Sequence, residues 1–373
     1  MKIRAAVTRA PHAPMSLETL EIEAPRADEV LIRISATGIC HTDIAMRDQV
    51  FPVPLPIVLG HEGSGVIEAV GSDAAGLAVG DHVVMSYASC GRDCAQCKSA
   101  AYSYCEQFFP LNFGGTRPDG STSLGCGTER VHSHFFGQSS FAEYAVCSAR
   151  QAVKVPKDAP LELLGPLGCG VMTGAGAVIH ALGVGAGESI AVFGTGSVGL
   201  SAVMAARLVG AETIIAIDVN PQRLALAEEL GASHTVDART QEPEAAIRKA
   251  LPGGVRYALD TTARPETIRA AIASLSARGT CGLLGASAPA DVACFSPMDM
   301  VSYGKSVRGI VEGNAVPAIL IPRLIELYRQ GRFPFDKLVK FYPFEAINEA
   351  IHDADTGKTV KPILRMRENS VPS

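Results

Sequence analysis

The sequence predicts an α/β protein with two domains, one rich in β-strands and one built on a doubly wound parallel sheet. Its 373 residues exceed the length of one typical domain. To about residue 155 the chain has short β-branched or alternating stretches separated by proline and glycine, as in a strand-rich domain. From about Gly165 apolar strands alternate with helical stretches, which is the pattern of a parallel sheet covered by helices.

The individual elements follow from the same patterns. Strands are expected in the first part at residues 1–7, 30–34 and 65–70, and in the second at 189–193, 213–217, 257–260 and 280–284. Helices are expected at 198–209, at 221–230 with Pro221 in the first turn, and between 260 and 274. The helix at 319–329 and the closing segment are too short for a domain, so they should rejoin the N-terminal part. The predicted domains are 1–165 together with 316–373, and 166–315.

Composition and charge narrow the class of protein. The net charge is −5 and no run of Lys and Arg forms a basic stripe, which argues against nucleic-acid binding. The N-terminus lacks the apolar stretch of a signal peptide, and apolar runs elsewhere are broken before membrane-spanning length. The ten cysteines are therefore interpreted as metal ligands and buried thiols in a reducing cytoplasm, not as a disulfide framework.

A glycine-rich turn predicts a dinucleotide site. Gly194, Gly196 and Gly199 fit the G-x-G-x-x-G pattern directly after an apolar strand and at the start of a helix. Asp218 follows 19 residues after Gly199, at the end of the next strand. Such an acidic residue bonds the adenosine ribose diol and repels a 2′-phosphate, so the pattern favours NAD over NADP. The alternative is an ordinary strand-to-helix turn followed by a solvated aspartate.

Two groups of residues suggest metal sites. Four cysteines within sixteen residues suit a closed tetrahedral zinc site; they are Cys90, Cys94, Cys97 and Cys105. The alternative is a set of surface or redox thiols. The second group, Cys40, His61 and Cys169, is dispersed along the chain between glycines, and each member alone reads equally well as a buried structural residue. Together they would leave the fourth position of a zinc ion open, but spacing alone does not join them.

These segments resemble the zinc-containing medium-chain dehydrogenase/reductase family over essentially the whole chain. The G-H-E-x-x-G stretch at residues 60–65 is specific to that family. The resemblance is closer to bacterial aryl (benzyl) alcohol dehydrogenases and to terpene-alcohol relatives such as geraniol dehydrogenases, through residues 47–49, 51–56, 134–141 and 162–170. It implies a GroES-like β-rich catalytic domain, a Rossmann domain, a homodimer or homotetramer, and NAD-linked oxidation of a primary benzylic or allylic terpene alcohol.

The family pattern also assigns roles at the zinc ions. It implies a structural zinc on the four clustered cysteines, although the family more often has two residues in the first gap, where this chain has three. It places the catalytic zinc on Cys40, His61 and Cys169. It makes Glu62 an alternate ligand, Asp43 the hydrogen-bond partner of the ligand histidine, and Thr42 the hydroxyl that takes the alcohol proton. Many relatives have a proton-relaying histidine where this chain has Ala45, so the proton must leave by another route.

Cofactor and substrate contacts follow from the same resemblance. It places His41 and Lys361 at the pyrophosphate, Thr173 and Val198 near the nicotinamide, and Arg223 near the adenosine ribose. It also places two aromatic residues in the substrate cleft, Phe135 and Phe136. Packing or surface roles are the alternative for all seven residues.

Four other functions remain open at this stage. They are a glutathione-dependent formaldehyde dehydrogenase, a short-chain aliphatic alcohol dehydrogenase, a quinone reductase, and a non-enzymatic zinc- or NAD-binding protein. Cys40, His61 and Cys169 argue against the quinone reductase, which needs no zinc.

Overall fold

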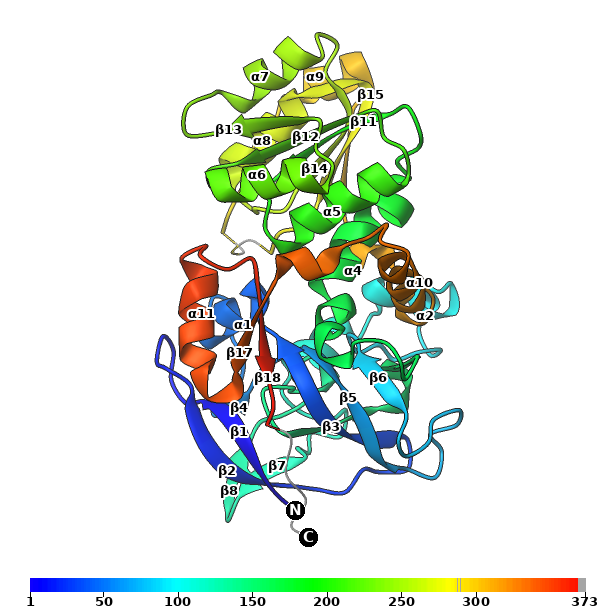
Figure 1. The fold of residues 1–373 in the computed structure, drawn as a ribbon, viewed down its shortest axis with the longest axis vertical. Helices are drawn as coiled ribbons and strands as arrows, with labels where there is room; N and C mark the ends of the chain where they lie inside the picture. Colours follow the sequence, from blue (N-terminus) through cyan, green and yellow to red (C-terminus); the bar gives the residue numbers. More distant parts are fainter. Residues whose placement is uncertain (287, 289, 368–373) are drawn as a thin grey trace. The chain divides into compact units, whose positions relative to one another are not determined.

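The computed structural model describes residues 1–286, 288 and 290–367 (Figure 1). The chain forms two compact units. The first contains Met1–Cys169, Val316–Glu326 and the chain from Leu338 onward, and the second contains Gly170–Ala315 and Leu327–Lys337. The helix α10 (Pro317–Arg329) contributes residues to both units.

The first unit is built on two sheets. One has the order β4 (Ile57–Val58), β1 (Lys2–Thr8), β2 (Ser16–Ile22), β7 (Leu124–Cys126) and β8 (Glu129–Val131). The other has the order β10 (Ala152–Val155), β6 (His82–Met85), β5 (Glu62–Val70), β3 (Glu29–Gly38), β18 (Lys361–Arg365) and β17 (Val339–Pro343), with β9 (Tyr144–Ser148) also on β3. The strands expected at 1–7, 30–34 and 65–70 are confirmed as β1 and parts of β3 and β5.

Short helices connect these strands. The α-helices are α1 (His41–Arg47), α2 (Ala95–Lys98), α3 (Phe108–Phe113) and α11 (Ile347–Asp355). The 3₁₀ turns are η1 (Tyr102–Tyr104), η2 (Phe135–Gly137), η3 (Ala149–Gln151), η4 (Leu161–Leu163), η5 (Gly165–Gly168) and η9 (Phe344–Ala346). Strand β18 pairs antiparallel with β3, which places the end of the chain beside the segment that leads into α1.

The second unit is a doubly wound parallel sheet. Its order is β13 (His234–Asp237), β12 (Thr213–Asp218), β11 (Ser189–Phe193), β14 (Val255–Asp260), β15 (Leu275–Leu283) and β16 (Ser306–Gly309), so the chain winds outward in both directions from β11. Its helices are α4 (Gly170–Gly176), the π-helix η6 (Ala177–Leu182), α5 (Ser197–Leu208), α6 (Pro221–Leu230), α7 (Pro243–Ala250), α8 (Pro265–Ala273) and α9 (Pro297–Tyr303). The remaining turns are η7 (Glu312–Asn314) and η8 (Phe335–Leu338).

The sequence pattern explains this sheet well. Parallel strands are covered on both faces, so they read as continuous apolar runs. Phe193, Ile215 and Ala258, from three neighbouring strands, are fully buried in one core with Ile247 and Ile272 of the covering helices. The expected α/β fold is confirmed. The edge strands β13 and β16 were not predicted, because each is only four residues long and mostly polar or exposed.

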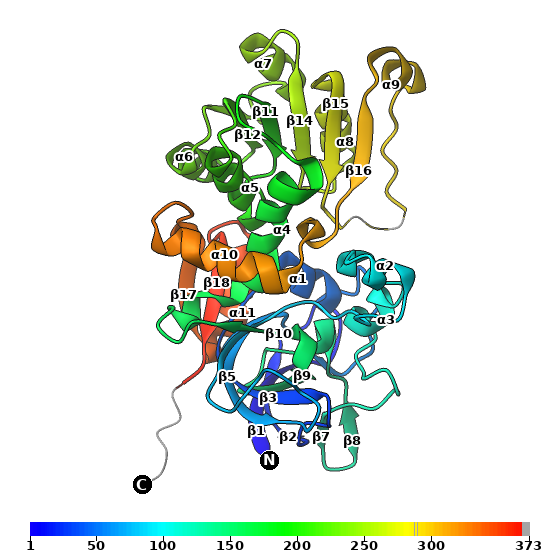
Figure 2. The same cartoon turned by 90° about the vertical axis from the view of Figure 1, so that its right-hand side faces the viewer.

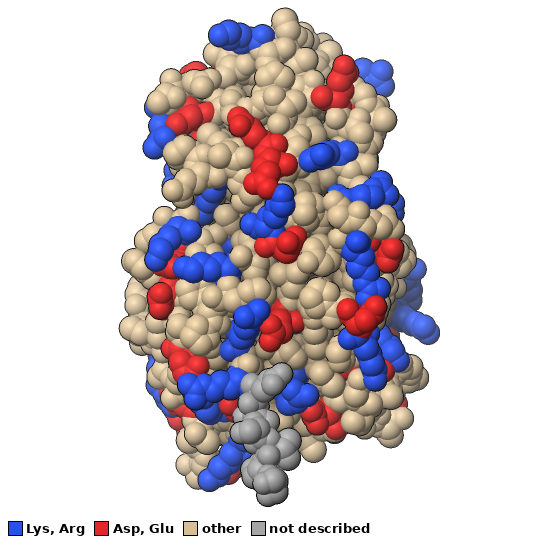
Figure 3. Space-filling view, viewed as in Figure 1, with Lys and Arg blue, Asp and Glu red and all other residues tan. Residues whose placement is uncertain are grey.

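The surface carries charges of both signs. On the face drawn in Figure 3, Lys and Arg alternate with Asp and Glu over both units, without a field of one sign. Among the described helices, none combines the length and the apolar character that a membrane span requires.

Candidate metal centres and dinucleotide site

The dispersed cysteines and histidine come together in the first unit. Ligand atoms of Cys40, His61, Glu62 and Cys169 all lie within 4.8 Å of one another. Cys40 precedes α1, His61 directly precedes β5, Glu62 begins that strand, and Cys169 follows η5. The set of two thiols and one imidazole matches the three protein ligands of a catalytic zinc site, with a carboxylate alongside.

Asp43 fixes the two ligand-bearing segments relative to each other. His61 Nδ1 donates to Asp43 Oδ1 at 2.8 Å, and both side chains are fully buried. The backbone N–H groups of Gly60 and Cys40 donate to the same carboxylate, at 3.1 and 2.9 Å. With Nδ1 bonded to Asp43, Nε2 is the ring nitrogen left to bind a metal ion; it is buried and has no hydrogen-bond partner among the described residues. A buried acceptor of this kind, aimed by a carboxylate, fits a metal ion.

The surroundings of the Cys40 thiol favour the binding of a cation. A hydrogen bond with Cys169 lowers the pKa of Cys40 well below its ordinary value, and this effect exceeds the opposing effect of burial. The thiolate is the form that binds metal, so the environment favours the ligand state.

Glu62 is held by a lysine from the end of the chain. Lys361 Nζ lies 2.8 Å from both carboxylate oxygens of Glu62 and donates to the carbonyl of Ile39 at 3.0 Å. Burial opposes a charge on Lys361, but the neighbouring Glu62 carboxylate raises the pKa of the lysine above its ordinary value. Lys361 therefore contacts the proposed alternate ligand directly, and its expected pyrophosphate contact remains a prediction.

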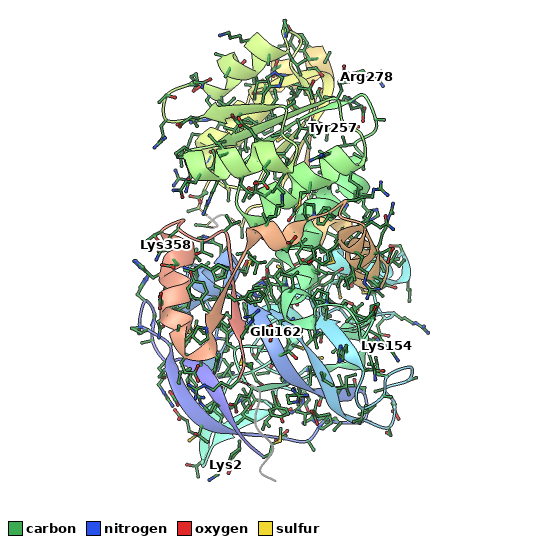
Figure 4. All side chains as sticks on the ribbon, in the orientation of Figure 1. Lys2, Lys154, Glu162, Tyr257, Arg278 and Lys358 are labelled. Carbon is green, nitrogen blue, oxygen red and sulfur yellow. The ribbon has the colours of Figure 1, made fainter. Side chains whose placement is uncertain are left out.

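Strand β18 accounts for the position of Lys361. Ile39 N–H donates to the carbonyl of Pro362 at 3.0 Å, which brings the start of β18 to the residue before Cys40. Two ion pairs hold the flanks of the strand: Lys358 with the buried Asp353, at 2.9 Å, and Arg365 with Glu162, at 2.7 Å. Figure 4 labels Lys358, in the turn after α11, and Glu162, in η4.

Thr42 and the two predicted phenylalanines lie beside this cluster. Thr42 Oγ1 is 3.7 Å from Cys40 Sγ. The Phe136 ring stacks on His61 with centroids 4.4 Å apart, and the Phe135 ring meets His61 edge-on at 5.6 Å. Both phenylalanines are buried. Their packing on His61 is consistent with a place near the metal, and a substrate contact remains a prediction.

A further aromatic residue was missed by the sequence reasoning. Phe113 of α3 contacts both Phe136, at 5.2 Å, and Phe135, at 6.0 Å. Phe108, on the same helix, contacts Phe136 at 6.5 Å. The available signal was the aromatic-rich run at residues 108–113, which forms α3.

The four clustered cysteines form a second centre in the first unit. Cys90 Sγ lies 3.5, 3.3 and 3.2 Å from the sulfurs of Cys94, Cys97 and Cys105. All four are free thiols, and a zinc tetrahedron with Zn–S bonds of about 2.3 Å has sulfur separations of roughly 3.8 Å, close to these values. Backbone hydrogen bonds from Glu106 and Cys97 lower the pKa of Cys94 to about 6. Gly91, in the first gap, has a φ of 80°, which allows a tight turn between Cys90 and Cys94.

The glycine fingerprint and Asp218 meet in the second unit. β11 ends at Phe193, and α5 begins at Ser197 after the three-residue turn. A Cβ on Gly199 would lie 1.8 Å from the Gly194 carbonyl, so only glycine allows this approach of helix and strand. At Gly196 a Cβ would meet nothing within 4 Å, which leaves the backbone open to a phosphate.

The other predicted cofactor residues are divided between the units. Val198 lies in the first turn of α5, and Arg223 lies on α6 with a buried Nε that has no partner among the described residues. Thr173 of α4 donates to Glu312 Oε2 at 3.0 Å, a partly buried contact that the sequence did not suggest. His41 and Lys361 belong to the first unit.

Comparisons with known proteins agree with this geometry. Residues 26–157 match the alcohol dehydrogenase GroES-like domain, and residues 197–328 match the zinc-binding dehydrogenase domain. A geraniol dehydrogenase of Castellaniella defragrans is 50% identical over 97% of both chains. The solved benzyl alcohol dehydrogenase of Acinetobacter calcoaceticus is 48% identical, with a TM-score of 0.96 over 98% of this chain and 100% of the other. The solved structure of an alcohol dehydrogenase zinc-binding domain protein of Burkholderia ambifaria is 55% identical, with a TM-score of 0.97 over 99% of this chain and 100% of the other.

Proposed function

Because the chain belongs to the zinc-containing medium-chain alcohol dehydrogenase family, we propose that it oxidises primary benzylic or allylic terpene alcohols to aldehydes with NAD. The observation that carries this proposal is the buried group of Cys40, His61 and Cys169, with Glu62 beside it. When bound, zinc supplies Lewis-acid chemistry toward an alcohol oxygen and NAD accepts the hydride.

The residues around that group would support metal binding and proton transfer. Asp43 would hold His61 in the tautomer that binds metal, and Lys361 would hold Glu62. Thr42 is our candidate for the hydroxyl that accepts the alcohol proton, because its oxygen lies next to the Cys40 sulfur. With Ala45 in the position of the family's relay histidine, the proton would continue through the cofactor ribose and His41, or through water.

The substrate class rests on two supports. One is the activity of two relatives, a geraniol dehydrogenase and a benzyl alcohol dehydrogenase. The other is the aromatic group of Phe135, Phe136 and Phe113 against His61, which suits a flat or elongated apolar alcohol. Oxidation of such an alcohol gives a conjugated aldehyde, which makes loss of the hydride easier.

The preference for NAD rests on Asp218. Its carboxylate ends β12 at the carboxyl edge of the sheet, where it can accept hydrogen bonds from a ribose diol and repel a 2′-phosphate. Gly194, Gly196 and Val198 would lie along the pyrophosphate and nicotinamide.

A homo-oligomer, formed with a second copy of the chain, is the partner we propose. Among the described strands β16 pairs only with β15, so it forms one edge of the sheet (Figure 2). The neighbouring α9 has no buried residue, and apolar side chains near this edge are exposed, namely Val292, Phe295, Met298, Val301 and Tyr303. A second copy can cover such a surface with the same surface of its own. None of the ten cysteines, all within the described residues, forms a disulfide, in keeping with the cytoplasmic location that we propose.

A steady-state comparison of benzyl alcohol, geraniol and ethanol tests the function. Each additional buried methylene is worth about 0.8 kcal/mol, so we expect kcat/KM for the two larger alcohols to exceed that for ethanol by orders of magnitude. Higher activity on ethanol would overturn the substrate class, and a requirement for glutathione would favour the formaldehyde dehydrogenase. No turnover on any alcohol, with zinc and NAD bound, would favour a non-enzymatic protein.

A further inference from the structure

The carboxylate of Asp218 receives four hydrogen bonds from the protein. Oδ2 accepts from the backbone N–H of Thr195 at 2.6 Å and from the hydroxyl of the same residue at 2.8 Å. Oδ1 accepts from the backbone N–H groups of Val219 and Asn220, at 2.7 and 2.9 Å. Three of the four donors are backbone groups, so the Thr195 hydroxyl is the single side-chain donor among them.

The position of Thr195 holds its hydroxyl in contact with Asp218. It lies between Gly194 and Gly196 in the glycine-rich turn, and it is fully buried. Its backbone N–H is already bonded to Asp218, and the side chain is β-branched and therefore stiff about χ1. The fingerprint pattern requires no hydroxyl between its first two glycines, so this feature is additional to the motif.

We infer that Thr195 is a positioning residue for the choice between NAD and NADP, acting through Asp218; this inference rests on the proposed NAD site. Bonds to both carboxylate oxygens hold the plane of Asp218 before any ligand arrives. A ribose diol then meets an oriented acceptor and less ordering is needed on binding. A 2′-phosphate meets a negative charge that cannot turn away.

The two effects make opposite predictions for the two cofactors. Without the hydroxyl, Asp218 keeps its three backbone donors but loses the side-chain bond on Oδ2, so the carboxylate is held less firmly. Binding of NADH should weaken, because the acceptor is less well oriented. Binding of NADPH should be unchanged or become tighter, because the carboxylate can move away from the phosphate. A merely structural role for Thr195 would weaken both cofactors together.

The test measures direct binding of NADH and NADPH to the zinc-loaded protein, with nicotinamide fluorescence as the signal. The variants are Thr195→Val, which removes the hydroxyl at nearly constant shape, and Thr195→Ser, which keeps it. Thr235→Val is the matched control, because it removes an exposed threonine-to-carboxylate bond to Glu228, of 2.7 Å, in the same unit. Melting temperatures show whether each variant is folded. If Thr195→Val does not fold, Thr195→Ala replaces it in the binding test.

For Thr195→Val we expect the dissociation constant of NADH to rise roughly tenfold, as for loss of one hydrogen bond to a charged group, with no such rise for NADPH. Thr195→Ser should stay within about twofold of wild type and Thr235→Val should not differ from it. In an Asp218→Ala background, Thr195→Val should leave the NADH-to-NADPH ratio unchanged, since the two residues act as one unit.

Three results would overturn the inference. They are equal shifts for both cofactors, a serine variant that behaves like the valine variant, and a full effect of Thr195→Val in the Asp218→Ala background. A wild-type protein that binds NADPH as tightly as NADH would overturn it as well. Binding is measured without alcohol, so failure to oxidise any alcohol would refute the proposed function and leave this inference standing.

Discussion

At the scale of single residues, the hydroxyl of Thr42 separates the proposed proton path from metal and cofactor binding. Thr42→Ala should lose most turnover and still bind zinc and NADH, because the hydroxyl contacts Cys40 and is not one of the grouped ligands. Thr42→Ser should keep much of the activity. Steady-state rates, zinc content and NADH binding check this, and an active Thr42→Ala protein would rule out the proton path.

Asp43 tests whether the tautomer of His61 matters. Asp43→Asn keeps the size of the side chain but replaces one acceptor oxygen with an NH₂ group, so the bond from His61 Nδ1 is weakened or lost. Loss of such an outer-shell partner typically costs about 10–100-fold in metal affinity. We expect a loss of this size for one zinc ion per chain, measured by competition with a chelator. Unchanged affinity for both ions would show that the bond between Asp43 and His61 does not support metal binding.

At the scale of elements, loss of a zinc ligand should affect folding stability in the four-cysteine segment and turnover at Cys169, which follows η5. Wild-type protein should hold two zinc ions per chain. Cys97→Ser should lower the melting temperature, because a closed site links zinc binding to folding. Cys169→Ser should abolish turnover and leave the melting temperature nearly unchanged. Elemental analysis and thermal unfolding measure both, and one zinc per chain in fully active wild-type protein would contradict the two-site assignment.

The turn before η2 should make stability depend on pH. Burial, with help from the Arg117 guanidinium, lowers the pKa of His134 to about 4 from an ordinary value near 6.5. The folded state thus holds His134 neutral, whereas the unfolded chain takes up a proton on this histidine below about pH 6.5. The free energy of unfolding therefore falls as the pH drops from about 6.5 toward 4. The full effect is about 3 kcal/mol in the free energy of unfolding.

The matched variant is His134→Asn, because residue 134 has a φ of 61° and asparagine tolerates that conformation. Between pH 6.5 and 4 the variant should lose stability less steeply than wild type, as measured by urea unfolding. Parallel slopes for the two proteins would show that His134 is not held neutral.

Sequence patterns predicted the elements best where the signal is local. Strands β11 and β12 are short apolar runs, and four cysteines within sixteen residues are close enough to suggest one site. The contact of Lys361 with Glu62 joins residues 299 positions apart, and that of Thr173 with Glu312 joins residues 139 apart. No periodicity or spacing signals such contacts, because they depend on how β18 pairs with β3 and how η7 packs on α4. Family resemblance, not pattern, linked Cys40, His61 and Cys169.

At the scale of the whole molecule, the exposed edge of the second unit determines the proposed oligomer. Val301 is 79% exposed on α9, next to the outer strand β16. A charge placed there would be buried without a partner if a second copy covers this surface, and such burial is strongly unfavourable. Val301→Asp should therefore shift the protein toward monomer. Val79→Asp, at a valine that is 64% exposed in the first unit, is the matched control and should not.

Light scattering coupled to size-exclusion chromatography measures the mass of each protein over a range of concentrations. Wild type and Val79→Asp should elute as the same oligomer, and Val301→Asp should dissociate at concentrations where they do not. The monomer should still bind NADH, because Gly194, Gly196 and Asp218 lie at the carboxyl ends of β11 and β12, on the far side of β14 and β15 from β16. An oligomer of unchanged mass in Val301→Asp would show that the interface lies elsewhere. A wild-type protein that is a monomer at every concentration would refute the proposed oligomer.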